Sequence, residues 1–225
     1  MLTPSLEWRT TYPGAAAGEL VMHHVVNPAN HPELDRRKAE LEDDIRARFG
    51  QGDRATLSAL PSLRPYVAYY GRFKKTYHVL LQLESVALKG KALPRVAALV
   101  ECMFMAELKN QLLTAGHDVD SLQGPVRLDV AKGDERYIML NGQEQTLKPN
   151  DMFIADDEGI ISDVIYGPDR RSCITETTHR VLFTVYAPPG IDARAVYDHL
   201  LDIQSNVLLI APQAEVVSLQ VHRTD

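Results

Sequence analysis

The chain has 225 residues, with 24 Lys and Arg against 30 Asp and Glu, giving a formal charge of −6. Hydrophobic residues make up 45% and charged residues 24%, ordinary values that exclude a collagen-like chain, a coiled coil or a largely disordered protein. The two cysteines, Cys102 and Cys173, exclude a disulfide scaffold and a four-cysteine zinc site. The acidic balance argues against bulk coating of nucleic acid, although a local basic patch remains compatible with it.

The first half of the chain is expected to contain two strands followed by helices. Residues 6–9 alternate in polarity and residues 19–26 are rich in Val and Leu, so both are predicted as strands around a turn at 12–14. Pro at a first helical position and apolar residues at helical spacing then indicate helices. These helices cover residues 32–49, 63–73, 79–88 and 94–114.

The hydrophobic period changes from helical to alternating near Gly124. Strands are predicted at 126–130, 137–140, 152–155, 160–165 and 180–187, followed by a helix at 192–206 and a strand at 215–221. Strands, helices, strands, a helix and a strand in this order indicate α+β rather than repeated βαβ units. We expect a single compact layered domain over residues 1–225, with mixed or antiparallel sheets and helices packed on them.

No strong catalytic signature is present. The chain lacks a Walker A loop, G-x-G-x-x-G, G-x-S-x-G and H-E-x-x-H, and no ligand spacing indicates a metal. His117-Asp118 follows a predicted helix and suits a cation or proton donor, but Asp there is more often a cap. The acidic run Asp156-Asp157-Glu158-Gly159 is typical of a hairpin turn, and metal binding is the less common alternative.

Residues 170–178 gather hydroxyls and a carboxylate just before an apolar strand. Thr and Glu side chains there could bind an amine, a hydroxyl or an attacking water. A capping box without catalysis explains the same run. Cys173 lies within it, but no activating His is evident from the sequence, and an inert thiol is the commoner arrangement.

Residues 64–95 are the most basic stretch, with seven Lys and Arg and the single acid Glu84. Five aromatic residues lie among these bases: Tyr66, Tyr69, Tyr70, Phe73 and Tyr77. Bases interleaved with aromatic rings suit a nucleic-acid backbone with stacked bases. A solvated charged face over aromatic core residues gives the same pattern and is more common.

Seven short segments follow one another in a characteristic order. They are Leu93-Pro94-Arg95-Val96, Leu99-Val100-Glu101, Gly116-x-Asp118-Val119-Asp120, Gly124-x-Val126-Arg127-Leu128, Lys148-Pro149-Asn150-Asp151, Ala155-Asp156-Asp157-Glu158-Gly159 and Ile174-Thr175-Glu176-Thr177-Thr178. Together they resemble the B3/B4 module, the tRNA-editing module of the bacterial phenylalanyl-tRNA synthetase beta chain. The upstream part is similar to free-standing versions of the module, so the resemblance covers almost the whole chain.

The resemblance implies strands and helices layered around a pocket, with residues 1–92 as an N-terminal strand-helix part and 93–225 as the core of the module. It also implies hydrolysis of the ester between a wrong amino acid and tRNA, by an oriented water and without a metal or cofactor. Some family positions differ in this chain. Met103, Phe104, Ala115, Ala98 and Thr184 replace the family's threonine, asparagine, histidine, arginine and glutamate, respectively, which implies a more apolar pocket.

The resulting hypothesis is a free-standing, cytoplasmic aminoacyl-tRNA deacylase whose partner is the aminoacylated 3′ end of tRNA, not DNA or a membrane. The alternative is a non-catalytic module that binds tRNA or an amino-acid-like ligand. Glu176, Thr175 and His117 are expected to be catalytic, and Val100, Glu101, Met103, Phe104, Asp118, Arg171 and Thr177 to bind substrate. Lys74, Lys75, Lys89, Lys91 and Arg95 are expected to contact tRNA. Glu101, Met103, His117 and residues 175–177 are expected to converge on one cavity.

Overall fold

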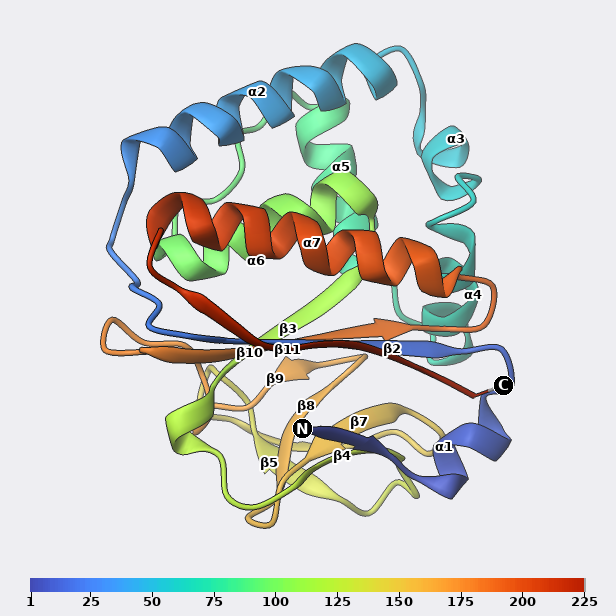
Figure 1. Cartoon of the computed structure of the whole chain (residues 1–225). Coiled ribbons are helices and arrows are strands. Elements are labelled where there is room, and N and C mark those ends of the chain that lie inside the picture. The colour runs from blue at the N-terminus through green and yellow to red at the C-terminus, as the bar shows by residue number, and fades with distance from the viewer. Residues whose placement is uncertain (225) are drawn as a thin grey trace.

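A computed structural model describes residues 1–224 (Figure 1). The described elements are, in chain order, β1 (Leu2–Pro4), α1 (Leu6–Thr11), β2 (Ala16–His23), α2 (Pro32–Phe49), α3 (Arg54–Ser58), α4 (Arg64–Arg72), α5 (His78–Ala87), α6 (Ala98–Asn110), β3 (Leu113–Asp118), the short 3₁₀ helix η1 (Val119–Ser121), β4 (Val126–Val130), β5 (Arg136–Ile138), β6 (Glu144–Thr146), β7 (Met152–Ala155), β8 (Ile160–Asp163), β9 (Gly167–Pro168), β10 (Arg180–Ala187), α7 (Ala193–Ile210) and β11 (Glu215–Arg223). The expected α+β fold of layered sheets and helices is confirmed.

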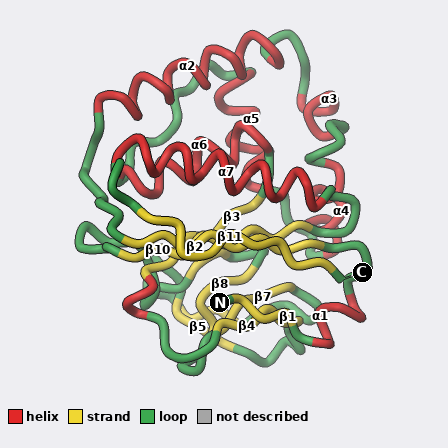
Figure 2. The backbone as a smooth tube through the Cα atoms, viewed as in Figure 1, coloured by secondary structure: helices red, strands yellow, loops and turns green. Residues whose placement is uncertain are grey.

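Two larger sheets lie beneath helices α2, α5, α6 and α7, as the strand and helix colours of Figure 2 show, and β5 and β6 form a separate two-stranded sheet. The upper sheet has the order β11-β2-β10-β3 and is antiparallel throughout. Helices α6 and α7 cover its upper face, and α2 lies above them (Figure 1). The lower sheet, β1-β4-β7-β8-β9, is antiparallel except where β1 pairs with β4. No helix within residues 1–224 is long and apolar enough to span a bilayer.

The strand predicted at residues 6–9 is wrong, because this segment forms helix α1. The Ser5 hydroxyl accepts a hydrogen bond from the Trp8 backbone N–H at 3.0 Å and caps the helix. Trp8 is fully buried, and its indole N–H points at the Met152 sulfur, 3.2 Å away. Residues 6–9 therefore form part of a helix although they alternate in polarity, because the Trp8 side chain reaches the core.

The helix predicted at 94–114 is also too long, since α6 ends at Asn110 and β3 follows at once. Gln111 ends the helix in the left-handed conformation, with φ of 59°. That conformation is usual for Gly or Asn rather than Gln. Tertiary contacts hold it: the buried Gln111 accepts hydrogen bonds from the Tyr77 hydroxyl at its carbonyl and from the Ser62 hydroxyl at its side chain.

Helix α7 packs on the upper sheet directly over Gly18 of β2. Asp192 caps this helix, and its buried stripe includes Val196 and Leu200. A Cβ added at Gly18 would lie 2.8 Å from the Val196 Cγ1 and 3.1 Å from the Leu200 Cδ1. It would also lie 3.3 Å from the Cβ of Val185 on the neighbouring strand. The helix can therefore approach the sheet this closely only because residue 18 has no side chain.

We expect Gly18→Ala to lower the free energy of unfolding by about 1–3 kcal/mol, because the added methyl overpacks the α7–β2 contact. Gly71→Ala on α4 is the matched control, since a Cβ there meets no atom within 4 Å. Alanine at this helical position should stabilise the protein by about 0.5–1 kcal/mol. Urea denaturation of both variants measures the two effects, and a Gly18→Ala protein as stable as the parent contradicts the packing.

Candidate functional site

A cavity of about 550 Å³ opens between helix α6 and strand β3, and we call it the α6–β3 pocket. Its walls come from α5, α6, β3, β10, residue 140 and the segments 163–168 and 173–174. The lining residues are His78, Gln82, Val100, Met103, Phe104, Glu107, Leu113, Thr114, Ala115, Gly116, Leu140, Asp163, Val164, Ile165, Tyr166, Gly167, Pro168, Cys173, Ile174 and Tyr186. Its volume suits a small-molecule ligand or one end of a larger one.

Most of the pocket wall is apolar. Val100, Met103 and Phe104 lie on consecutive turns of α6 and face the opposite wall at Ile174. Gly116 lets these groups approach, because a Cβ there would lie 2.8 Å from the Ile174 Cδ1 and 3.4 Å from the Met103 sulfur. The result is a surface that excludes water from an apolar side chain of a ligand.

Glu107 is the outstanding polar group in this wall. Its side chain is almost fully buried, and one carboxylate oxygen accepts the Thr114 backbone N–H at 2.7 Å. The other oxygen, Oε2, has no hydrogen-bond partner among the described residues. Burial raises the pKa of Glu107 to about 8. An unpartnered buried carboxyl is costly, and a cationic donor in the pocket would remove that cost.

A second acidic site lies at the segment 163–168. Asp163 accepts the backbone N–H groups of Tyr166 and Gly167 at 2.8 and 2.9 Å, which shapes this part of the wall. Asp163 interacts directly with the carboxyl of Asp151, and burial raises the pKa of both groups. Two carboxyls in contact retain a shared proton, so this pair is less available to a ligand than Glu107.

The structure brings three of the predicted substrate-binding residues into the pocket: Val100, Met103 and Phe104. Glu101 faces the other way. Its carboxylate lies 2.6 Å from the Lys38 ammonium of α2 and accepts the Val96 N–H at 2.9 Å. Of the groups expected to converge on one cavity, Met103 alone lines the pocket. The prediction that Glu101, His117 and residues 175–177 join it there is wrong.

Residues 175–177 form an exposed turn beside the pocket and not inside it. The hydroxyls of Thr175 and Thr177 lie 3.0 Å apart, and Glu176 is exposed. The preceding residues, Cys173 and Ile174, are the part of this segment that lines the cavity. Any contact between Glu176 and a ligand therefore requires a ligand that extends beyond the pocket.

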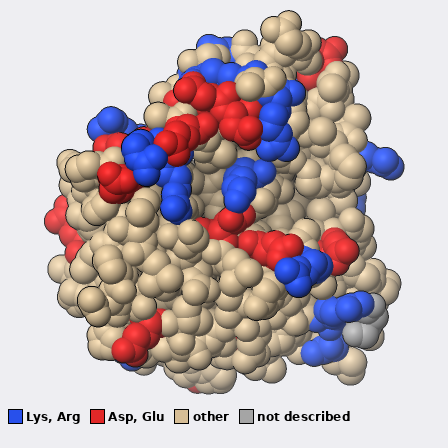
Figure 3. Space-filling view, turned by 45° about the horizontal axis from the view of Figure 1, so that its top comes forward, with Lys and Arg blue, Asp and Glu red and all other residues tan. Residues whose placement is uncertain are grey.

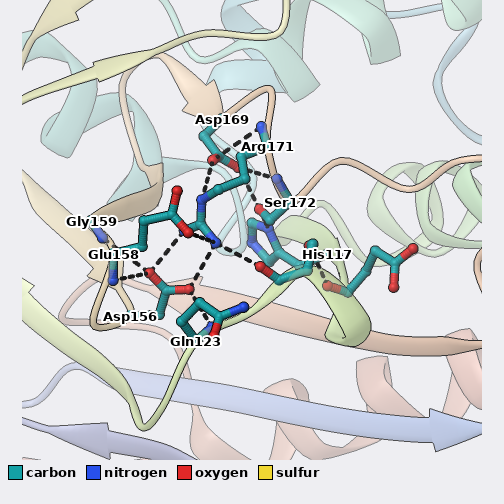
Figure 4. A network of polar contacts seen from close by, with 10 residues as sticks. His117, Gln123, Asp156, Glu158, Gly159, Asp169, Arg171 and Ser172 are labelled. Atoms are coloured by element: carbon teal, nitrogen blue, oxygen red, sulfur yellow. Dashed lines mark hydrogen bonds and ion pairs between the residues drawn. The ribbon is translucent and has the colours of Figure 1, made fainter.

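His117 and Arg171 belong to a polar network with Ser172, Asp169 and Asp156 (Figure 4). Arg171 is held by Asp156 at 2.8 Å, by Glu158 at 3.5 Å and by Asp169 at 3.8 Å. This network fixes the turn at 156–159, where the Asp156 N–H also donates to the Gly159 carbonyl as the hairpin-turn interpretation requires. Arg171 therefore holds a loop in place outside the pocket lining.

Asp118 caps η1. Its side chain accepts the Asp120 backbone N–H at 3.0 Å and the Thr178 hydroxyl at 2.7 Å. The capping interpretation of this residue is confirmed, and the cation-binding one has no support in its contacts.

His117 is fully buried behind the pocket wall. One ring nitrogen lies 2.8 Å from the Ser172 hydroxyl and the other 3.3 Å from the Ser162 hydroxyl. Burial lowers the pKa of His117 to about 3, so the ring is neutral at physiological pH. Ser162 also lies 2.6 Å from the hydroxyl of Tyr186, which lines the pocket. The His117 ring is thus linked to the pocket through two hydroxyl groups.

The Lys and Arg residues predicted to bind tRNA do not form one continuous positive patch. Lys89 is paired with Glu84 at 2.7 Å, and Arg95 lies 3.9 Å from Asp35. The Lys75 ammonium lies 5.3 Å from the centre of the Tyr166 ring at the pocket wall. Lys74 and Lys91 are exposed. On the face that Figure 3 shows, basic and acidic side chains lie next to one another.

The aromatic residues of the same stretch are not available for stacking on bases. Tyr66, Tyr69, Tyr70 and Tyr77 are all buried, and Tyr66 and Tyr77 stack on each other with ring centres 4.4 Å apart. The interpretation as a charged face over an aromatic core is therefore correct for these rings. His78 also lines the pocket, with its ring edge-on to Tyr70 and Tyr77, and the sequence did not single it out.

Residues 65–205 match the sequence profile of the B3/4 domain. Phenylalanine–tRNA ligase beta subunits of Mycoplasma pneumoniae and Bartonella henselae are 33% identical over 69 residues and 39% identical over 66 residues. These alignments cover 31% and 29% of this chain but only 9% and 8% of the ligase subunits. The chain thus matches less than a tenth of each of these relatives.

A solved N-terminal fragment of the phenylalanyl-tRNA synthetase beta subunit from Pyrococcus horikoshii is also similar. It has a TM-score of 0.48 and 10% sequence identity, over 92% of this chain and 48% of that chain.

The Glu107 environment predicts a pH dependence of stability. The carboxyl has an ordinary pKa near 4.5 when unfolded and about 8 when folded, so the folded state holds an extra proton between these values. The free energy of unfolding should therefore fall as pH rises through this window. Gln at position 107 keeps the acceptor for the Thr114 N–H but cannot ionise. We expect the stability of Glu107→Gln relative to the parent to increase from pH 5 to pH 8.

Urea denaturation of the two proteins at pH 5, 6, 7 and 8 measures this difference. Other titrating groups are common to both proteins and cancel in the comparison. A stability difference that stays constant across this range contradicts a raised pKa at Glu107.

Proposed function

Because the chain belongs to the B3/4 domain family, we propose that it binds the aminoacylated 3′ end of tRNA and hydrolyses the aminoacyl ester in trans. The observation that carries the proposal is the unpartnered carboxylate oxygen of Glu107 in an otherwise apolar pocket. The names of the matched ligase subunits, which concern phenylalanine and tRNA, support this substrate class. Such a protein would act where charged tRNA is found, in the cytoplasm.

An aminoacyl ester has the two features that this pocket can recognise. Its α-ammonium group is a compact cation that fits beside Glu107, and its side chain can pack on Val100, Met103 and Phe104. The cation would favour the ionised form of Glu107, because an opposite charge nearby lowers a carboxyl pKa. Among residues 1–224 the side-chain oxygen of Gln82 also lacks a partner, so it is a second acceptor in the lining.

Hydrolysis requires little more than this positioning. A water oxygen bonds to the ester carbonyl carbon, the bond from that carbon to the ribose oxygen breaks, and a proton from the water passes to the released ribose oxygen, which becomes a hydroxyl. The reaction is downhill, so a site accelerates it mainly by orienting the water and stabilising the oxyanion. Thr175, Glu176 and Thr177 are candidates to contact this part of the substrate from the pocket mouth.

A second candidate function is binding without turnover. It is favoured by the burial of a neutral His117 behind the wall and by the exposed position of residues 175–177. Both functions use the same pocket and the same Glu107, so a single set of variants tests them together.

We expect the protein to deacylate at least one member of a panel of mischarged tRNAs, with turnover unchanged by a chelator. Glu107→Gln should lower kcat/KM by about tenfold or more, since it replaces a charged hydrogen bond to the ammonium with a neutral one. Glu101→Gln is the matched control on the same helix, because Glu101 faces Lys38 and not the pocket. The control should lose stability but keep kcat/KM close to that of the parent.

Three results separate the alternatives. Turnover that depends on Glu107 supports the deacylase. Binding of charged tRNA that depends on Glu107, without turnover, supports the binding module. Charged tRNA that is neither bound nor hydrolysed, or an equal loss in both variants, contradicts the assignment of the pocket.

A further inference from the structure

A second depression lies next to the α6–β3 pocket, and we call it the α5 groove. It has a volume of about 330 Å³ and runs between α5 and the segment 91–94. His78 and Gln82 line both the groove and the pocket, so the two spaces adjoin. We propose that the α5 groove holds the 3′-terminal nucleotides of the RNA whose aminoacyl group enters the pocket, an inference that rests on the proposed function.

Covalent connection fixes where those nucleotides must lie. The ester oxygen belongs to the terminal ribose, so an aminoacyl group inside the pocket leaves that ribose at the pocket mouth. The chain of nucleotides then continues over a neighbouring surface. The depression at Arg37, Lys109 and Asp202 and the one at Arg64 and Pro189 share no lining residue with the pocket. The α5 groove shares two.

The groove also offers surfaces for a base. His78 lies at the boundary between the two spaces. Its ring contacts Tyr70 and Tyr77 edge-on, and we expect it to stack on a base from the groove side, as aromatic side chains do in single-strand binding. Leu81, on the next turn of α5, is 40% exposed and extends the apolar surface beside His78. Pro94 closes the opposite side.

One cation in this groove is free to meet a phosphate. Lys91 lines the groove, and within residues 1–224 no carboxylate lies within 4 Å of its ammonium. Its backbone N–H donates to the Ser85 carbonyl at 3.0 Å, which ties the segment to α5. Lys89, two residues earlier, is instead paired with Glu84 at 2.7 Å and does not line the groove. The two lysines therefore differ in availability although they are close in sequence.

Two probes test the proposal. The first is 3′-aminoacylamino-3′-deoxyadenosine, a stable amide that has no phosphate. The second is a tRNA acceptor minihelix that ends in the same amide. Lys91→Glu should weaken minihelix binding about fivefold at physiological salt and lower the slope of log affinity against log salt by about 0.7. It should leave binding of the nucleoside unchanged.

Lys89→Glu changes the net charge equally and serves as the control, with a smaller effect on minihelix binding and its salt slope. His78→Ala should weaken both probes about fivefold or more through lost stacking. Circular dichroism and urea denaturation establish that each variant is folded.

If the nucleoside fails to bind the parent protein, the proposed function fails. If the nucleoside binds but Lys91→Glu and Lys89→Glu weaken the minihelix equally, or neither does, the groove proposal alone is overturned. If His78→Ala binds both probes like the parent, the stacking contact is overturned.

Discussion

The pocket exists because helix α6 stops at Gln111 and the chain turns straight back as β3. The left-handed Gln111 brings the side chains of Met103 and Glu107 against the backbone of residues 113–116. The same turn orients the acid, because one Glu107 oxygen spans it to the Thr114 N–H and the other is left without a partner. A continuous helix to residue 114 would remove both the cavity and this orientation.

Behind the pocket wall, a neutral polar network joins the two sheets. His117 on β3 reaches Ser162 on β8, and Ser162 meets Tyr186 on β10. Each of these three side chains has a hydrogen-bond partner, which is what a polar contact between two apolar layers requires. The charged part of the network, around Arg171, lies nearer the surface and holds the loops at 156–159 and 169–172.

Much of the fold follows from local patterns in the sequence. Pro at the start of α2, alternation in β4 and apolar runs in β7 and β10 predict those elements within a few residues. The prediction of a strand at residues 6–9 failed because Ser5 and the buried Trp8 favour a helix. The helix predicted at 94–114 was too long because Gln111 carries no local stop signal. In both places contacts from distant residues decide the conformation.

The sequence predicted only part of the site, again because contacts in the folded protein decide which side chains face the pocket. Glu101 and Glu107 stand six residues apart on α6, which places them about 120° apart around the axis. Because α6 is buried on nearly all sides, no polar face shows which glutamate meets the pocket. Counting charges likewise could not reveal that Lys89 is paired while Lys91 is not.

A crystal structure with a 3′-aminoacylamino-3′-deoxyadenosine bound, using the amino acid that binds most tightly, tests the role of Glu107 directly. The ligand ammonium should lie within about 3 Å of the Glu107 Oε2. The amino-acid side chain should lie against Val100, Met103 and Phe104, and the ribose at the mouth beside His78. A ligand bound elsewhere, or one in the pocket with its ammonium turned away from Glu107, would contradict that role.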